Sequence, residues 1–384
     1  TGMAAALTLA EAGRSVRLLE AAEIGAGGSG RNAGLVNAGL WLPPGDVEGA
    51  LGAGAGARLN AALAAGPGQV FDLIDRHAIA CEARRAGTLH LAHGRGGLAD
   101  LRLRAEQLTA RGAPVTLLDG EETARRTGSA TFPGALHDAR TGTIQPLAYL
   151  RGLARAAVAA GAVLHEHSPV TARRVTAGKW VIETPGGRVR ADRLLWATNA
   201  YGDGAAPALP YTMVPYFQIA TAPLRGNAGA TILPGGEGAW DNATVMSSFR
   251  RDAAGRLILG GIGRAEGPAG GIHRGWARRT IRRLFPQLGP VEVEHAWWGR
   301  IAMTADHIPK IARLGADGLA IWGYSGRGIA PGTVFGTAAA RALMGENDAL
   351  PVEAIPLPEP RRRGAEGAAI ELGAALAHLT RGWL

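Results

Sequence analysis

The first twenty residues, TGMAAALTLAEAGRSVRLLE, constrain the fold more than any other stretch of the chain. Residues 2–12 are mostly strong helix formers, and Gly13 stands where a helix end favours a residue that adopts positive φ. The run SVRLLE that follows is short and apolar, and it ends in an acid, Glu20. The pattern predicts a helix, a tight turn and a strand with a carboxylate at its end.

A helix followed by a strand that ends in an acid is typical of the second half of a dinucleotide-binding βαβ unit. There the acid accepts hydrogen bonds from ribose hydroxyls, and the helix N-terminus faces the pyrophosphate. Gly2 precedes Glu20 by 18 residues (20 − 2), which suits the third glycine of the G-x-G-x-x-G fingerprint. We therefore expect the first strand and the first two glycines to lie upstream of residue 1. An ordinary helix before a strand is the alternative that these residues leave open.

Chain length and cysteine content limit the classes of protein to which the chain can belong. A chain of 384 residues can bury a large core, and it predicts two domains or one large composite. No apolar run approaches the roughly 20 residues that span a bilayer. The single cysteine, Cys81, excludes an intrachain disulfide framework and favours a reducing compartment. We expect a soluble protein of the cytoplasm.

The net charge of +9 comes almost entirely from arginine, because Lys179 and Lys310 are the only lysines. The arginines are dispersed, and no basic run is interleaved with stacking aromatic residues, which argues against nucleic acid as a partner. The one dense cluster, residues 361–363, lies in a proline-rich link to the C-terminal tail. An anionic cofactor or substrate explains part of the charge equally well.

Helices and strands are expected to alternate along the chain. The expected helices lie near residues 58–76 (interrupted at 66–68), 98–111, 145–162, 276–288 and 365–380. The expected strands are two within 78–92, then 163–166, 170–175 and 180–184 as one meander, then one within 190–202 that runs into a turn, several within 211–264, and 291–303. Residues 319–345 predict a strand, a glycine loop and a helix.

Several motifs occur in one order along the chain. They are the first helix with Glu20, GGSGRNAG (27–34), GTIQPLAYLRGLARAAVAAGA (142–162), HSPVTARRV (167–175), LLWATNAYG (194–202), WWGRIAMTADHIPKI (297–311) and GYSGRGIAPGTVFGTAAARAL (323–343). By these motifs the chain resembles the FAD-dependent oxidoreductases of the D-amino-acid oxidase superfamily, in the group of glycine oxidase, sarcosine oxidase and gamma-glutamylputrescine oxidase. The resemblance covers most of residues 1–346.

The resemblance implies an α/β fold, with a Rossmann-like FAD-binding domain (its first strand missing) and an inserted antiparallel-sheet substrate domain. The FAD-binding domain is expected to be discontinuous, at 1–50, 140–205 and 300–346. Residues 51–139 and 206–299 would form the substrate domain, and 347–384 a C-terminal tail with a helix.

The resemblance also implies non-covalent FAD, because the cysteine that attaches the flavin in some relatives has no counterpart at the matching position. Glu20 would hold the adenosine ribose, Arg31 would offset phosphate charge, and Arg327 or Arg300 would place a positive charge beside the pyrimidine end of the flavin. The expected cofactor-binding residues are Gly2, Glu20, Ser29, Gly30, Arg31, Asn32, Val170, Ala197, Thr198, Gly326, Arg327, Gly328 and Ile329.

Three further features resemble functional motifs but also have a simpler structural interpretation. GAGAGA at 52–57 fits part of a nucleotide fingerprint, but no strand precedes it, and we expect a loop. His165 and His167 could form half a metal site, but no third ligand has suitable spacing, so no metal is expected. Trp297 and Trp298 could line a substrate pocket or fill a domain interface.

The implied reaction is oxidation of the C–N bond of an amine or amino acid, by hydride transfer to flavin N5. It gives an imine and, with oxygen, hydrogen peroxide; another electron acceptor would serve in a dehydrogenase. No catalytic acid or base is assigned, and Arg300, Tyr324, Trp298 and Tyr216 are pocket candidates. Ile329 and Ala330 stand where sarcosine-type relatives carry a carboxylate-binding lysine. The alternatives are an FAD-binding subunit of a dehydrogenase complex and an inactive fragment of a flavoprotein.

Overall fold

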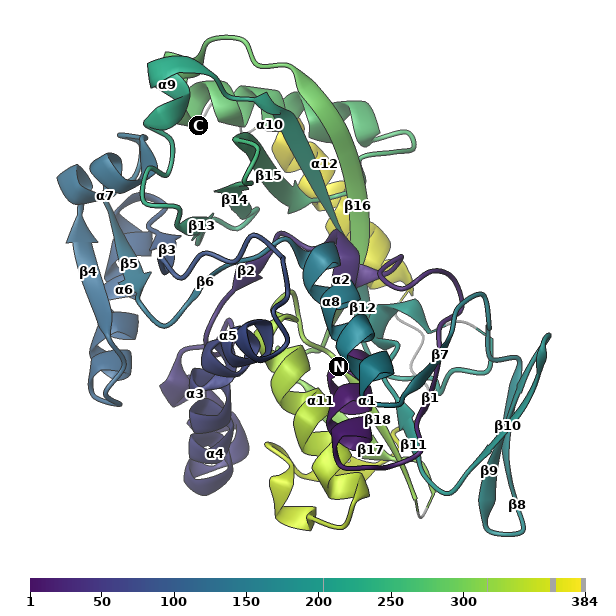
Figure 1. Cartoon of the computed structure of the whole chain (residues 1–384). Coiled ribbons are helices and arrows are strands. Elements are labelled where there is room, and N and C mark those ends of the chain that lie inside the picture. The colour runs from purple at the N-terminus through teal and green to yellow at the C-terminus, as the bar shows by residue number, and fades with distance from the viewer. Residues whose placement is uncertain (203, 316, 360–363, 381–384) are drawn as a thin grey trace.

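The structure is a computed structural model that describes residues 1–202, 204–315, 317–359 and 364–380. Helices and strands alternate along the chain (Figure 1). The helices are α1 (Gly2–Glu11), α2 (Gly28–Arg31), α3 (Pro44–Leu51), α4 (Ala53–Ala64), α5 (Gly66–Arg76), α6 (Gly94–Thr109), α7 (Gly120–Thr127), α8 (Pro146–Ala159), α9 (Gly226–Ala230), α10 (Gly270–Leu284), α11 (Ala330–Leu343) and α12 (Gly364–Thr380). Single 3-10 turns lie at Asn199–Tyr201, Pro286–Leu288 and Asn347–Ala349.

The largest sheet has the strand order β16-β12-β15-β14-β13-β3-β5-β4. Its strands are β3 (Thr88–Leu91), β4 (Val115–Asp119), β5 (Gly134–Asp138), β12 (Thr212–Pro223), β13 (Gly238–Asp241), β14 (Ser247–Arg251), β15 (Arg256–Ile262) and β16 (Val293–Met303). The sheet is antiparallel, as expected, except between β13 and β3, which run parallel. These two strands come from distant segments of the chain, so no hairpin dictates their direction.

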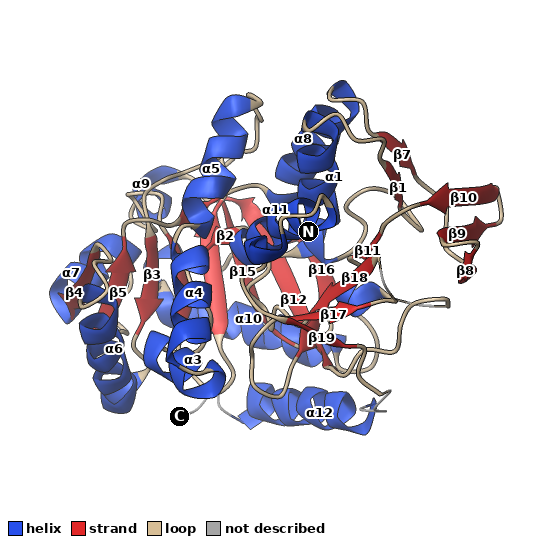
Figure 2. Ribbon diagram, turned by 90° about the horizontal axis from the view of Figure 1, so that it is seen from below, coloured by secondary structure: helices blue, strands red, loops and turns tan. Residues whose placement is uncertain are grey.

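One face of this sheet carries the larger core. Phe217, Phe249 and Phe285 are fully buried there with Ile281 of α10. Figure 2 shows α10 and α12 below the long strands β12 and β16, and α1 and α8 above them. Of these helices, α12 packs on β12 and α10 on β15.

The other half of the fold is built on short parallel strands. β1 (Arg17–Leu19) pairs with β7 (Val163–His165), and β11 (Leu194–Trp196) pairs with β18 (Gly318–Trp322). β17 (Lys310–Arg313) and β19 (Ala354–Pro356) extend the second sheet, and β2 (Leu35–Val36) pairs with β6 (Gly142–Thr143). The chain thus combines parallel strands, helices and a large mixed sheet, which is the α/β class expected from the sequence.

Helix α1 packs between α8 and α11 through small residues. A Cβ at Gly336 of α11 would lie 2.4 Å from the carbonyl oxygen of Thr1 and 3.1 Å from Cβ of Ala4. Only glycine allows two helix backbones to approach this closely. The contact brings the start of α1 next to the loop that precedes α11.

The expected meander was partly wrong. Residues 163–165 do not join it but pair with β1, and the meander is β8 (Ala172–Thr176), β9 (Lys179–Thr184) and β10 (Gly187–Ala191). The apolar run at 163–165 is short, and its partner lies far away in sequence. Local spacing therefore could not identify the pairing.

Two further local predictions were wrong. The stretch 52–57 is not a loop, since α4 begins at Ala53 after Gly52 with a φ of +82°. Alanine favours helix, and Gly56 lets α4 lie against α3, because a Cβ there would be 2.4 Å from Cα of Glu48. Residues 78–92 hold one strand, β3, and an isolated bridge at Arg84, whereas Cys81 lies in a buried bend.

The tail helix was predicted at 365–380, and α12 spans 364–380. It packs on β12 and α10. The arginine cluster at 361–363 lies outside the described residues. In the described ranges, no helix is both long and apolar enough to cross a bilayer. The domain boundaries and the cytoplasmic location stay predictions.

Candidate functional site

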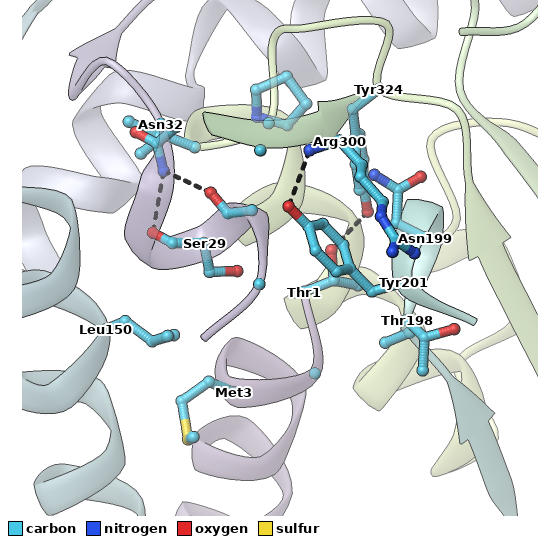
Figure 3. A pocket seen from close by; sticks show the side chains of 18 of the residues that line it. Thr1, Met3, Ser29, Asn32, Leu150, Thr198, Asn199, Tyr201, Arg300 and Tyr324 are labelled. Atoms are coloured by element: carbon cyan, nitrogen blue, oxygen red, sulfur yellow. Dashed lines mark hydrogen bonds between the residues drawn. The ribbon is translucent and has the colours of Figure 1, made fainter. Parts of the chain in front are cut away.

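A cavity of about 2090 Å³ is lined from both halves of the fold. Figure 3 shows part of it, with residues from α1, α2, α8, the loop after β11, β16 and the loop before α11. The predicted cofactor residues that line it are Gly2, Glu20, Ser29, Arg31, Asn32, Val170, Ala197, Thr198, Gly326, Arg327, Gly328 and Ile329. Segments far apart in the sequence therefore meet at one cavity, and only Gly30 of the predicted set is outside its lining.

Gly30 has a packing role in this structure. A Cβ on it would lie 2.3 Å from the carbonyl oxygen of Gly25 and 3.1 Å from Cδ1 of Leu147. Any side chain there would push α2 away from the preceding turn and from α8. The glycine thus shapes the loop whose neighbours, Ser29 and Arg31, reach the cavity.

Glu20 follows the last residue of β1 and lies at the cavity wall. Its amide donates to the carbonyl of His165 at 2.8 Å, which continues the β1–β7 pairing by one residue. Its Oε1 accepts the N–H of Ala22 at 3.1 Å, so the carboxylate is oriented by its own loop. The remaining carboxylate lone pairs can accept hydrogen bonds from a ligand.

Asn32 holds the glycine-rich loop in shape. Its Nδ2 donates to the carbonyls of Gly28 (3.1 Å) and Ser29 (2.9 Å), and its Oδ1 accepts the N–H of Gly34 at 2.9 Å. These bonds end α2 and turn the chain into β2. Figure 3 shows the Asn32 side chain bent back over Ser29.

Arg31 connects the same loop to β16. Its Nη1 donates to the carbonyl of Trp298 at 3.1 Å, and its own carbonyl accepts Nε1–H of Trp297 at 3.0 Å. The side chain lines the cavity while being tied to the large sheet. Its predicted role in offsetting phosphate charge stays a prediction.

Tyr201 holds the loop after β11 against β16. Its hydroxyl accepts the backbone N–H of Arg300 at 2.8 Å, and the Arg300 guanidinium carbon lies 5.5 Å from the centre of its ring. The ring also covers Gly27 and Gly28, where a Cβ would lie 3.4 Å from ring carbons. Figure 3 shows Tyr201 between Arg300 and the start of α1. This residue was not identified from the sequence, because its contacts are all distant in the chain.

The loop Gly323–Gly328 reaches the cavity at the N-terminal end of α11. Gly323, Ser325 and Gly326 have φ values of +85°, +49° and +92°, so the loop turns sharply. Within the described ranges, the N–H groups of Gly328 and Ile329 have no hydrogen-bond acceptor. Free amides at a helix N-terminus form a site for negative charge.

The side chains of this loop point in different directions. The Tyr324 hydroxyl lies 2.5 Å from Oγ1 of Thr1, and burial raises its pKa above the usual range. The Arg327 guanidinium turns towards the loop after β2, where its Nη1 donates to the carbonyl of Ala38 at 2.9 Å. The predicted place of Arg327 beside the flavin pyrimidine therefore has no contact that supports it.

The large sheet and the loop after β2 form the other wall of the cavity. Tyr216, one of the pocket candidates, lines it and hydrogen-bonds to Oγ of Ser248 at 2.9 Å, and burial raises its pKa. Arg300 and Tyr324 line the cavity as well. Trp298 is not in the lining; its Nε1 donates to Glu266 at 3.3 Å and its ring packs on the core of the large sheet.

Sequence reasoning missed much of this wall. Trp41, Trp240, His90 and Arg104 line the cavity, from the loop after β2, from β13, from β3 and from α6. The ring centres of His90 and Trp240 are 3.4 Å apart, and those of Trp41 and Trp240 are 4.9 Å apart. None of the four lies in a motif with a chemical signature, so the sequence offered no signal for them.

The sequence predicted no metal site, because no third ligand has suitable spacing to His165 and His167. In the part of the chain that the structure describes, no three His, Cys, Asp or Glu side chains are grouped to hold an ion. His165 Nε2 lies 3.2 Å from Nη1 of Arg17.

Comparison with known proteins finds relatives that match most of the chain. The family model described as FAD dependent oxidoreductase (DAO) matches residues 1–342. The chain is 34% identical to "Probable oxidoreductase OrdL" of Rhizobium meliloti (strain 1021), over 91% of this chain and 82% of that protein. It is 31% identical to the gamma-glutamylputrescine oxidoreductase of Escherichia coli (strain K12), over 90% and 82%.

Solved structures share the fold at low sequence identity. Glycine oxidase from Geobacillus kaustophilus matches with a TM-score of 0.72 at 20% identity, over 89% of this chain and 91% of that one. L-proline dehydrogenase from P. horikoshii matches with a TM-score of 0.73 at 18% identity, over 91% and 93%. With the cavity and its motifs in place, the chain belongs to the DAO family of FAD-dependent oxidoreductases.

Proposed function

We propose that this oxidoreductase binds FAD non-covalently in the cavity and oxidises a C–N bond of an amine or amino acid. The observation that carries the proposal is the continuity of one cavity from Glu20, at the end of β1, through the glycine loop before α11, to the aromatic wall on the large sheet. Such a cavity can hold an extended cofactor with a small substrate at its far end. When bound, FAD supplies a two-electron acceptor for hydride.

The residues fit FAD by their own chemistry. Glu20 offers carboxylate oxygens for ribose hydroxyls, and the free N–H groups of Gly328 and Ile329 offer donors at the N-terminus of α11. Gly326 and Gly328 are exposed to the cavity and leave backbone accessible. Cys81, the single thiol, is buried and outside the lining, which supports non-covalent binding.

The substrate would lie against the wall that contains Tyr216, Trp240 and Trp41. These rings exclude water and hold the amine carbon in place, and the product imine would hydrolyse after release. Proton loss from the substrate nitrogen to solvent suffices, so no side-chain base is assigned. The relative in Escherichia coli is named for gamma-glutamylputrescine, which supports an amine as the substrate class.

We also propose that an upstream strand completes the parallel sheet. Among the described strands, β1 pairs only with β7 and β11 only with β18, so each has an open edge. The cavity lining continues along both edges, through Val16, Leu18, Leu195 and Trp196. Open edges leave N–H and C=O groups unpaired, and a strand between them would pair both.

The proposed reaction is tested by anaerobic titration of the FAD-loaded protein with a panel of primary and secondary amines. We expect the flavin absorption near 450 nm to bleach with a productive amine, and oxygen to restore it with release of peroxide. Bleaching without reoxidation by oxygen would favour the dehydrogenase-subunit alternative. Absence of bleaching by every amine and amino acid, with flavin bound, would contradict C–N oxidation.

A further inference from the structure

Two arginines lie together at the substrate wall of the cavity. Arg327 comes from the glycine loop before α11, and Arg104 comes from α6. Both contact Trp41: the Arg327 guanidinium carbon lies 5.1 Å from the centre of a Trp41 ring, and Nη2 of Arg104 donates to the Trp41 carbonyl at 2.8 Å. The arginines therefore contact the ring and the backbone of one tryptophan, and both line the cavity.

Neither arginine is neutralised by contact with an acid. In the described ranges, no carboxylate lies within ion-pair distance of either guanidinium, and Arg327 is only 8% exposed. Asp100 and Asp46 act on Arg104, and Asp138 acts on Arg327, only through longer-range attraction. Two like charges thus share a partly dehydrated site, which is costly without an anion nearby.

Most of the donors on these groups are also unused. A guanidinium has five N–H donors. In the part that the structure describes, Arg327 donates only to Ala38 and Arg104 only to Trp41. The Nε of each is buried without a partner. Buried donors without acceptors are rare in folded proteins unless a ligand or water satisfies them.

The groups around the two arginines also favour an anionic ligand over a cationic one. The Arg327 guanidinium lies over Trp240 at 4.5 Å as well as over Trp41, so an arginine already occupies the aromatic faces that would attract a cationic ligand. Burial, with the nearby charge of Arg104, lowers the pKa of Arg327 to about 9. Burial and both arginines hold the pKa of His90 well below its usual range, so His90 is neutral and adds no counter-charge.

Asp241, a buried carboxylate of the same wall, is already satisfied by its own turn. Asp241 accepts hydrogen bonds from the backbone N–H of Ala243 (3.1 Å), the N–H of Ser247 (3.2 Å) and the hydroxyl of Ser247. It stabilises the turn between β13 and β14 and is not aimed at the arginines by any contact. Asp100 and Asp46 reach Arg104 only through longer-range attraction, so the unused donors of both arginines are available to an anionic ligand.

We propose that Arg104 and Arg327 form an anion subsite that binds a carboxylate of the substrate, so that the enzyme takes amines that carry a carboxylate and rejects those with a second ammonium group. A planar carboxylate matches the fork of N–H donors on a guanidinium. The subsite deepens the proposed function and rests on it for the reaction, but the binding itself does not require turnover.

The test is direct calorimetric binding of butanoate, butylammonium and 1,4-diammoniobutane to the FAD-loaded protein and to the protein without FAD. We expect butanoate to bind and the diammonium ion not to bind. Arg104→Gln and Arg327→Gln should each weaken butanoate at least tenfold, and Arg104→Lys should restore part of the loss. Arg102→Gln, an exposed arginine on the same helix, should leave the affinity unchanged.

The outcomes separate this subsite from the proposed reaction. Because Arg327 is buried, Arg327→Gln could fail to fold; Arg104, which is less buried, is therefore the primary variant, with thermal unfolding as the check on both. Equal butanoate affinity in Arg104→Gln and the parent protein, or tighter binding of the diammonium ion than of butanoate, would overturn the subsite. Butanoate binding that depends on Arg104 in a protein that oxidises no amine would support the subsite and contradict the proposed reaction.

Discussion

At the scale of single residues, the cavity depends on close contacts that only small residues allow. Tyr201 lies over Gly27 and Gly28, and Gly30 touches the backbone of Gly25. These contacts set the path of the loop that connects β1 to β2. Ser29 and Arg31 reach the cavity because their neighbours have no side chain.

Gly30→Ala is expected to lower the free energy of unfolding by about 1–3 kcal/mol, since its Cβ would overlap the Gly25 carbonyl. Gly49→Ala is the matched control: Gly49 lies in helix α3 with nothing within 4 Å of its Cβ position. That variant should be neutral or more stable by up to about 1 kcal/mol, because alanine favours helix. Urea unfolding of both variants measures the difference, and equal stabilities would contradict the close contact.

Glu20→Gln is expected to weaken FAD binding about tenfold, because a hydrogen bond to a charged group contributes about 1.5–3 kcal/mol. Glu23→Gln, three residues along the same loop and outside the cavity lining, is the control and should bind FAD normally. Fluorescence titration with FAD measures both dissociation constants. A normal FAD affinity in Glu20→Gln would show that Glu20 does not bind the ribose.

At the scale of elements, α12 is fixed to α10 by a pair of buried histidines. Nδ1 of His273 and Nδ1 of His378 are 2.7 Å apart, so one ring donates and the other accepts, and the accepting ring must be neutral. Trp276 stacks on His378 with ring centres 4.1 Å apart. Burial first, then the charges of His273 and Arg279, lowers the pKa of His378 to about 3, and burial lowers that of His273.

These shifts predict that acid weakens the fold. The unfolded chain binds protons at both histidines near pH 6.5, whereas the folded chain does not, so stability is complete above that pH and is lost as the pH falls from about 6.5 towards 3. Each such histidine contributes a slope of about 1.4 kcal/mol per pH unit in the free energy of unfolding. Urea unfolding at pH 7.5 and 5.5 measures the slope.

His378→Phe should flatten this pH dependence, because phenylalanine keeps the stack on Trp276 but cannot be protonated. His295→Gln is the control, since the side chain of His295 is 63% exposed. An unchanged slope in His378→Phe would show that the histidine pair does not control acid stability.

Elements with strong local signals could be predicted from the sequence. Pro146 at the start of α8 and Gly161 beyond its end marked that helix, and the alanine-rich tail marked α12. The pairing of β7 with β1 and the parallel β3–β13 pair could not, because each joins segments far apart in sequence. Arg104 and Tyr201 were missed for the same reason: their roles come from neighbours that only the folded chain supplies.

At the scale of the whole molecule, the cavity brings together three features that suit the binding of a flavin. It has an acid at the end of a parallel strand, free amides at a helix N-terminus, and an aromatic wall from a separate sheet. The open edges of β1 and β11 face the same cavity. A strand that fills this gap would stiffen the cofactor end, so we expect a chain extended upstream to bind FAD more tightly and to unfold at a higher temperature.

The most direct measurement is the visible absorption spectrum of the purified protein after incubation with FAD and removal of free flavin, for residues 1–384 and for the chain extended upstream. We predict that the extended protein keeps flavin bands near 370 and 450 nm, at about one flavin per chain. Residues 1–384 should show the same bands at equal or lower occupancy. If both proteins are folded and neither retains flavin, the claim that this cavity binds FAD is wrong.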